Sequence, residues 1–385
     1  MSSNCTKKVV YIDSKHLRKE CDRIPQVNGR ATLVHELIVA CGLLNHLTPV
    51  PSRLATEEEI SSFHSRLYID FLQQVNESDD LEAHEDEQEE FGLGYDTPLL
   101  SRMYDHVRVI GGGSVVAAEA LTSSGAEVAI NWCGGWHHAQ RDGAEGFCYV
   151  NDIAMAILKM CKKFQRILYV DMDLHHGDGV QNAFASTSRV MTLSLHHHGP
   201  GIYPCSGDVT DVGISNGRYY AVNVPLHEGV SDSTYCDVFQ KVTEKVFDTY
   251  RPDALVVQCG ADGLHGDPVG CAFNLTSETY TTCASLLLSR GLPTLFLGGG
   301  GYNLPNTARC WVALTAAIAG CKLPAEVPEH DFLGEYGPYF EFGVQPSLRK
   351  DYNTKEYIDS IVQQITDRYE IYSPRYSSRK HVERC

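Results

Sequence analysis

Two kinds of segment alternate along the chain: short runs in which nearly every position is apolar, and longer stretches in which apolar positions recur at helical spacing. The short runs are residues 8–13, 127–132, 166–172, 189–195, 218–224, 254–259 and 294–297. Continuous apolar runs of this length are typical of parallel strands buried on both faces. The helical stretches between them include residues 31–47, 152–164, 234–250 and 306–319. The alternation predicts an α/β fold, with a parallel sheet covered by helices on both faces.

A capping box marks the start of a further helix. Thr56 and Glu59 stand three residues apart, so that the hydroxyl and the carboxylate can accept hydrogen bonds from amides of the first turn. Ile60, Phe63 and Leu67 follow at helical spacing, and we expect all three in the core.

Two segments are too polar to join this core. Residues 77–90 hold nine acidic side chains in fourteen positions, which predicts a solvated surface loop. A loop that attracts basic peptides is the alternative. Residues 373–385 form a short basic tail that we expect to fray. One sheet can organise a chain of 385 residues, so we expect a single domain spanning residues 1–385.

Composition narrows the possible partners. The chain has 49 Asp and Glu against 32 Lys and Arg, a formal net charge of -17, which argues against direct binding to nucleic acid and favours a cationic substrate. Its 14 cysteines include no C-x-x-C pair, so we expect reduced thiols in an intracellular protein. No run approaches the roughly 18 apolar residues of a membrane span, and we expect a soluble protein.

Residues 171–178, Asp-Met-Asp-Leu-His-His-Gly-Asp, concentrate chemistry at the end of an apolar run. In an extended strand Asp171, Asp173 and His175 would share one face, because alternate side chains point the same way. Carboxylate oxygen and imidazole nitrogen suit a divalent ion such as zinc, and a catalytic zinc takes three protein ligands. We expect the third ligand to come from another segment.

Three other apolar runs end in reactive residues. Ligands of open α/β sheets bind at the carboxyl ends of the strands, where His137 and His138, Asp262, and a glycine run ending at Tyr302 all follow predicted strands. Each signal is weak alone, since a histidine pair, a capping aspartate or a glycine turn is usually structural. Four of them at four junctions of one sheet predict an active site, with Asp262 as the missing metal ligand.

Amide hydrolysis suggests a role for each remaining group. A metal would polarise the carbonyl and acidify the attacking water. His137 and His138 would transfer protons, each with a carboxylate behind its far nitrogen, and Asp171 and Asp178 fit that need. Tyr302 could donate to the developing oxyanion.

Five motifs together resemble the class I zinc-dependent histone deacetylases. They are residues 134–139 (Gly-Gly-Trp-His-His-Ala), 145–152 (Glu-Gly-Phe-Cys-Tyr-Val-Asn-Asp), 171–179, 260–262 and 297–302. The resemblance covers residues 9–339 and implies the arginase/deacetylase fold, with a central eight-stranded parallel sheet. It implies a hydrolase of the nucleus and cytoplasm that removes acetyl groups from N6-acetyl-lysine in histones and other proteins.

The resemblance also assigns the site residues. It implies zinc, with iron as the alternative in the cell, on Asp173, His175 and Asp262. It pairs His137 with Asp171 and His138 with Asp178, and gives Tyr302 the transition-state role. The substrate-binding residues that it implies are Asp96, Gly146, Phe147 and Tyr203. The first potassium site that it implies uses Asp171, Asp173, His175, Ser194 and Leu195. The second uses Phe184, Thr187, Val190 and Tyr220.

Some positions depart from the family pattern. Tyr203 replaces the usual tunnel phenylalanine, Gln140 stands where lysine is common, and residues 269–273 carry one extra residue. Pro268 stands where members of co-repressor complexes have an arginine for inositol phosphate, so we expect no obligate complex and no inositol phosphate. Residues 196–198, His-His-His, suggest a polar loop, with a second metal site as the alternative.

Three other functions compete with protein deacetylation. An acetylpolyamine amidohydrolase would use similar chemistry. A catalytically silent binding protein of the same fold would not need the full set of ligands and proton-transfer residues. A dimanganese ureohydrolase would need Asp-x-His-x-Asp spacing, where this chain has Asp-x-Asp-x-His.

Overall fold

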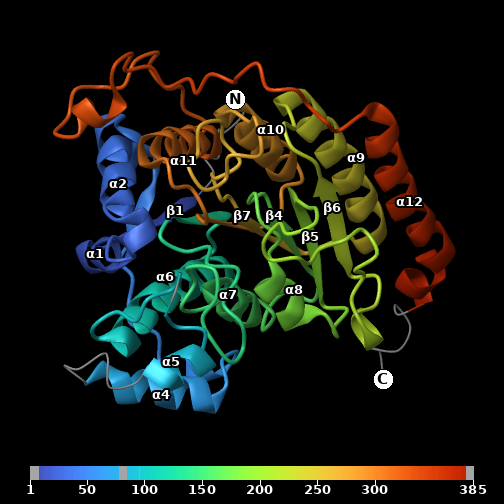
Figure 1. Ribbon diagram of the computed structural model, residues 1–385, viewed down its shortest axis with the longest axis horizontal. Helices are drawn as coiled ribbons and strands as arrows, with labels where there is room; N and C mark the ends of the chain where they lie inside the picture. The colour runs from blue at the N-terminus through green and yellow to red at the C-terminus, as the bar shows by residue number, and fades with distance from the viewer. Residues whose placement is uncertain (1–7, 78–84, 95, 379–385) are drawn as a thin grey trace.

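The structure, a computed structural model, describes residues 8–77, 85–94 and 96–378. These residues form one α/β unit around an eight-stranded sheet with strand order β2-β1-β3-β8-β7-β4-β5-β6 (Figure 1). Every strand pair is parallel. The predicted α/β fold with a parallel sheet is therefore confirmed.

The strands agree closely with the apolar runs of the sequence. They are β1 Val9–Ile12, β2 Thr48–Val50, β3 Val128–Asn131, β4 Ile167–Asp171, β5 Val190–His197, β6 Ala221–Leu226, β7 Ala254–Gln258 and β8 Thr294–Leu297. Only β2 had no apolar run to indicate it. It lies at the sheet edge, is three residues long and contains Pro49, which an edge strand tolerates because one side of it needs no partner.

Helices cover both faces of the sheet. They are α1 Lys15–Cys21, α2 Arg30–Ala40, α3 Glu57–Ser61, α4 Arg66–Asn76, α5 Glu85–Glu90, α6 Met103–Ser123, α7 Asp152–Met160, α8 Asp178–Phe184, α9 Asp232–Tyr250, α10 Ser277–Leu288, α11 Leu304–Ala319 and α12 Lys355–Ser378. Among the described helices, none is both long and apolar enough to cross a membrane.

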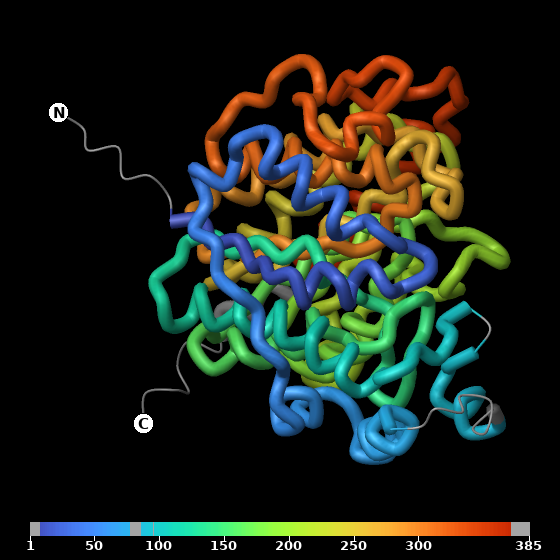
Figure 2. Tube along the Cα trace, turned by 90° about the vertical axis from the view of Figure 1, so that its left-hand side faces the viewer, coloured from blue at the N-terminus to red at the C-terminus, as the bar shows by residue number. Residues whose placement is uncertain are grey.

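Alternate strand residues feed two separate cores. In β1, Val9 and Tyr11 join the core formed with α2, α9, α10, α11 and α12, whereas Val10 and Ile12 join the core formed with α1, α4, α6 and α7. Figure 2 shows the two layers from the side, with the C-terminal segments in orange and red above the sheet and α4 in light blue below it. Because a core packs against each face, the sheet is held rigidly, and so are the loops that leave its carboxyl edge.

The prediction that Leu67 lies in the core is wrong. Ile60 and Phe63 are buried, but Leu67 is 74% exposed. Helix α3 ends at Ser61, and Ser65 caps a new helix, α4. This break changes which face points inward, so the helical spacing does not carry across it.

Both predicted polar segments are more ordered than expected. Within the acidic segment, Glu85–Glu90 forms α5, and Phe91 after it stacks on Phe71 of α4 at 4.8 Å. Residues 78–84 lie outside the described residues. The basic tail continues α12 as far as Ser378, and residues 379–385 lie outside the described residues. Ile358, Ile361 and Ile365 bury one side of α12, and this anchored helix extends into the predicted tail.

Candidate active site

Four loops at the carboxyl edge of the sheet hold the reactive residues. They follow β3, β8, β7 and β4, which are distant in sequence but adjacent in the sheet. The carboxyl ends of parallel strands lie at one edge, so adjacency brings these four loops to one place.

Asp173, His175 and Asp262 form a group whose ligand atoms all lie within 4.8 Å of one another. His175 Nδ1 is 2.9 Å from Asp262 Oδ2 and 3.3 Å from Asp173 Oδ1. No other such group of His, Cys, Asp and Glu occurs within the described part of the chain. The expected common strand face is wrong, because β4 ends at Asp171 and the loop after it carries both Asp173 and His175.

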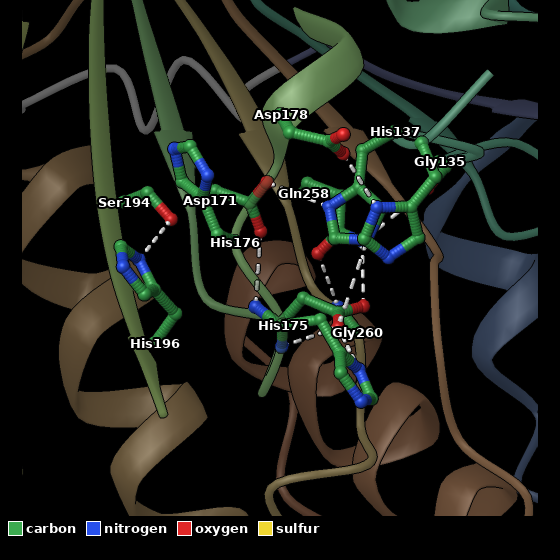
Figure 3. Close-up of polar contacts among 12 residues, drawn as sticks. Gly135, His137, Asp171, His175, His176, Asp178, Ser194, His196, Gln258 and Gly260 are labelled. Atoms are coloured by element: carbon green, nitrogen blue, oxygen red, sulfur yellow. Dashed lines mark hydrogen bonds and ion pairs between the residues drawn. The ribbon is translucent and has the colours of Figure 1, made fainter. Parts of the chain in front are cut away.

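Neutral donors hold the remaining carboxylate oxygens. Asp173 Oδ2 accepts hydrogen bonds from Gln258 Nε2 at 2.8 Å and from the Gly300 amide at 2.9 Å. Asp262 Oδ1 accepts from the Leu174 amide at 2.9 Å. Figure 3 labels Gln258 and, from this group, His175. One oxygen of Asp262 is therefore anchored while the other faces His175.

The chemistry of this group fits a divalent cation. Burial and the neighbouring Asp173 raise the pKa of Asp262 to about 7. Burial opposes charge on His175, yet its contacts with Asp173 and Asp262 raise its pKa to about 10. Two buried carboxylates thus demand a positive charge between them. Two carboxylate oxygens and one imidazole nitrogen are the donors that zinc accepts in catalytic sites.

The two histidines each pair with a different aspartate. His137 Nδ1 lies 2.8 Å from Asp171 Oδ2, which also accepts a hydrogen bond from the Tyr169 hydroxyl at 2.6 Å (Figure 3). His138 Nδ1 lies 2.7 Å from Asp178 Oδ1. In each pair the aspartate fixes the ring orientation and leaves Nε2 directed away from the pair.

The two rings have opposite proton affinities. Burial disfavours the charged form of His137, but Asp171 and Asp173 raise its pKa to about 9. Burial and the neighbouring His137 lower the pKa of His138 to about 4. At neutral pH these shifts favour a charged His137 beside a neutral His138.

A cavity of about 280 Å³ leads to these groups from the surface. Its walls include all four residues expected to bind substrate, which are Asp96, Gly146, Phe147 and Tyr203. They also include the expected catalytic residues His138 and Tyr302, the expected metal ligand His175, and Val269. The Phe147 and Tyr302 rings meet edge to face at 5.6 Å, and Tyr203 meets His138 in the same way at 4.9 Å. The cavity is thus a tunnel with aromatic walls.

Asp96 lies exposed at the mouth of this tunnel. Its carboxylate accepts a hydrogen bond from the Thr97 hydroxyl at 3.1 Å, and its carbonyl accepts one from Gln26 Nε2. The Thr97 hydroxyl in turn accepts a hydrogen bond from the Phe147 amide at 3.0 Å. The turn that carries Asp96 is therefore tied to the tunnel wall.

Three residues of the two expected potassium sites, Val190, Ser194 and Leu195, lie on β5. Asp171 at the end of β4 is the register partner of Ser194, which precedes Leu195. The second set gathers at the start of β5, where the Thr187 amide donates to the carbonyl of Phe184, the last residue of α8.

The three histidines at the end of β5 form no metal-binding group among the described residues. His196 is buried, with its ring nitrogens 2.8 Å from the Ser194 hydroxyl and 2.8 Å from the Gly207 carbonyl (Figure 3). His197 instead packs on Phe273. The predicted polar loop is wrong for His196 and His197, which are the last two residues of β5.

Sequence reasoning missed three residues that hold the site. Gln258 donates a hydrogen bond to Asp173 and is the last residue of the otherwise apolar strand β7. A side-chain amide in a buried strand is unusual and could have indicated a functional role. Asp152 accepts hydrogen bonds from the amides of Gly135 and Trp136, just before the histidine pair. Asp267 accepts from the amides of Tyr302 and of three other residues, joining two rim loops.

Comparison with known proteins agrees with this geometry. The histone deacetylase domain model matches residues 24–318. Histone deacetylase 8 of Xenopus tropicalis is 48% identical over 357 residues, covering 92% of this chain and 96% of that protein. Histone deacetylase 8 of Danio rerio is 46% identical over 361 residues, 94% of each chain. Human histone deacetylase 1 is 40% identical over 341 residues, 89% of this chain and 70% of that protein. The chain belongs to the histone deacetylase family.

Proposed function

We propose that this enzyme removes the acetyl group of N6-acetyl-lysine at a zinc ion held by Asp173, His175 and Asp262, releasing acetate and lysine. The observation that carries the proposal is the convergence of this ligand group, two histidine–aspartate pairs and Tyr302 at the floor of one aromatic tunnel. Iron could occupy the same three ligands, because its ligand preferences overlap with those of zinc.

A bound zinc ion would polarise the acetyl carbonyl and lower the pKa of a water molecule. Neutral His138 can accept a proton from that water and pass it to the lysine amine as the amide bond breaks. Charged His137, fixed by Asp171, stabilises negative charge that develops on the substrate. Asp178 keeps the His138 ring in the orientation that both proton transfers need.

The tunnel residues bind and orient the acetyl-lysine. Phe147 and Tyr203 offer aromatic faces to the methylene chain, and Gly146 leaves room beside them. Tyr302 donates a hydrogen bond from its hydroxyl to the carbonyl oxygen as charge develops there. Asp96 at the mouth accepts hydrogen bonds from backbone amides of the bound peptide.

We also propose that potassium binds at the two expected sets of residues, which include Val190, Ser194 and Leu195 of β5. In the first set, Asp171, Asp173, His175, Ser194 and Leu195 bring oxygen atoms close to the histidine pairs. In the second, the carbonyl of Phe184 stands at the C-terminus of α8, where the helix dipole favours a cation, with Thr187, Val190 and Tyr220 nearby. Both ions would stiffen loops that carry site residues.

The expected substrates are acetylated histone tails and other acetylated proteins. A net charge of -17 favours the basic sequences of such tails. All described cysteines are free thiols, which suits the reducing nucleus and cytoplasm. Pro268 offers no charge to an inositol phosphate, so we propose that the enzyme acts without an obligate co-repressor complex.

Metal analysis and substrate comparison together test the proposal. The purified protein should contain one zinc or iron ion and should hydrolyse acetyl-lysine peptides faster than acetylpolyamines. Faster cleavage of acetylpolyamines would make the protein a small-molecule amidohydrolase. Absence of both activities in metal-loaded protein would leave a catalytically silent binding protein.

A further inference from the structure

Asp267 lies in the loop after β7 and is 2% exposed. Both oxygens of its carboxylate accept backbone hydrogen bonds. Oδ1 accepts from the amides of Val269 at 3.0 Å and Gly270 at 2.8 Å. Oδ2 accepts from the amides of Tyr302 at 2.7 Å and Asn303 at 3.1 Å. A buried carboxylate is costly unless donors surround it, and here amides from two different loops meet that need.

The first of these loops, residues 266–270, touches the expected metal ligand Asp262. A Cβ atom on Gly270 would clash with the Asp262 carbonyl oxygen, so the two backbones pass in contact and only glycine fits between them. Asp262 is itself held, because its side chain accepts a hydrogen bond from the Leu174 amide at 2.9 Å. Val269, the residue before Gly270, lines the tunnel. This loop therefore has a fixed place relative to the metal ligands.

The second loop carries Tyr302 and leads into α11, whose N-cap is Asn303. Tyr302 lines the tunnel, and its ring meets the Phe147 ring at 5.6 Å. The Asp267 carboxylate lies next to the N-terminus of α11, where the helix dipole favours a negative charge. Its position is thus favourable for reasons that do not depend on substrate.

The nearest anchor before Tyr302 in the same loop is Gly300. Its amide donates to Asp173 at 2.9 Å, and its carbonyl accepts from the Ala261 amide at 2.8 Å. Gly301 stands between this anchor and Tyr302 with a φ of 129°, a conformation that favours glycine because it has no side chain. The anchor at Gly300 therefore does not by itself direct the Tyr302 side chain.

We propose that Asp267 is a positioning residue that fixes the Tyr302 hydroxyl relative to the metal ligands by binding both loops with one carboxylate. One oxygen holds the loop that touches Asp262, and the other holds the loop that carries Tyr302. The hydroxyl then has its place before the substrate carbonyl arrives, as an oxyanion donor requires. The inference rests on the oxyanion role proposed for Tyr302.

A double-mutant cycle on kcat for an acetyl-lysine peptide tests this role. Asp267→Asn keeps the size but has one acceptor oxygen, so the amides of one loop face an NH₂ group. It should lower kcat about tenfold, as loss of a hydrogen bond to a charged group does. In the Tyr302→Phe background the same change should lower kcat less than about twofold, because no hydroxyl remains to be positioned. Effects that multiply would overturn the proposal.

Hydrogen exchange gives a readout that does not depend on turnover. Mass spectrometry follows the backbone amides of residues 269–270 and 302–303, which Asp267 binds in the parent. At least one of these two segments should exchange faster in Asp267→Asn, whereas β7 should exchange as in the parent. Metal content should not change, because all three expected ligands are kept. Parent-like exchange in both segments, or loss of metal, would remove the positioning role.

A matched control separates positioning from stability. Asp253 accepts a hydrogen bond from the Arg166 amide at 2.9 Å, at the amino ends of β4 and β7 and so at the opposite edge of the sheet. Asp253→Asn should leave kcat unchanged. Thermal unfolding is measured for both asparagine variants. If the loss of kcat follows melting temperature across the two variants, Asp267 has only a structural role.

Asp267→Glu separates placement from charge and serves also if Asp267→Asn does not fold. It keeps the carboxylate but adds one methylene group, so the two loops cannot keep their spacing. Its kcat should fall in the parent background and change little in the Tyr302→Phe background. A parent-like kcat would show that the charge suffices and that Asp267 does not set the position of Tyr302.

The parent enzyme separates this inference from the proposed function. Without turnover of acetyl-lysine by the metal-loaded parent, the proposed function fails, and hydrogen exchange alone decides whether Asp267 fixes the Tyr302 segment. Normal turnover in Tyr302→Phe would overturn the inference, since no hydroxyl would need a position. With normal turnover in the parent, a slow Tyr302→Phe variant and effects that multiply, only the positioning role fails.

Discussion

At the floor of the tunnel Asp173 is buried and accepts hydrogen bonds from Gln258 and from the Gly300 amide, whereas at the mouth Asp96 is exposed and its carboxylate contacts the Thr97 hydroxyl. The floor therefore has its geometry before any substrate arrives. The mouth retains unused acceptor capacity, which a bound peptide can fill. We expect substitutions at the floor to abolish chemistry and substitutions at the mouth to alter substrate selection.

The largest effect is expected from the metal ligands themselves. His175→Ala and Asp262→Asn each remove one of three ligands, so metal affinity should fall by more than the roughly 10–100-fold that loss of an outer partner costs. Activity should fall in parallel. Metal content by mass spectrometry and turnover of an acetyl-lysine peptide measure both. Stoichiometric metal and near-normal turnover in either variant would remove that residue from the ligand set.

Tyr302→Phe should cost about 10²–10³ in turnover, the range for one oxyanion donor. Fold, metal content and inhibitor binding should be preserved, because Asp267 holds this position through the backbone amide and not through the hydroxyl. Steady-state kinetics with an inhibitor titration check this. An unchanged turnover number would move the oxyanion role to another residue.

Gln258→Leu tests whether the floor depends on its buried supports. The variant keeps the size of the side chain but removes the donor to Asp173, so metal affinity should fall about 10–100-fold. Competition with a chelator measures the affinity. Thermal unfolding of the metal-free protein serves as the control, since a packing defect would lower stability without metal as well.

The smallest effect is expected at the mouth. Asp96→Leu should lower kcat/KM on an acetylated peptide about tenfold, because bonds from a carboxylate to amides contribute about 1.5–3 kcal/mol each. Asp96→Asn should lose less. A minimal acetyl-lysine analogue without those amides should be nearly unaffected. Equal losses on both substrates would show that Asp96 shapes its turn and does not clamp the peptide.

The sequence predicted the sheet and the site for a common reason. Buried parallel strands require apolar runs, and reactive residues at the ends of those runs must share an edge of the sheet. The roles assigned to these residues remain predictions.

What the sequence missed depends on contacts that no local pattern records. Helix α6 contains Gly111, Gly112 and Gly113, although glycine is a poor helix former. Gly112 is needed because the chain passes close by at Arg53: a Cβ atom on Gly112 would lie 1.8 Å from the Arg53 carbonyl oxygen.

The order of the strands has a consequence for how the enzyme is made. Asp262 follows His175 by 87 residues, and β8 must enter the sheet between β3 and β7 before the Gly300 amide can reach Asp173. A ribosome-bound chain that ends before β7 carries only two of the three proposed ligands, Asp173 and His175. We therefore expect a metal ion to bind late in biosynthesis, after residues 254–300 have joined the sheet.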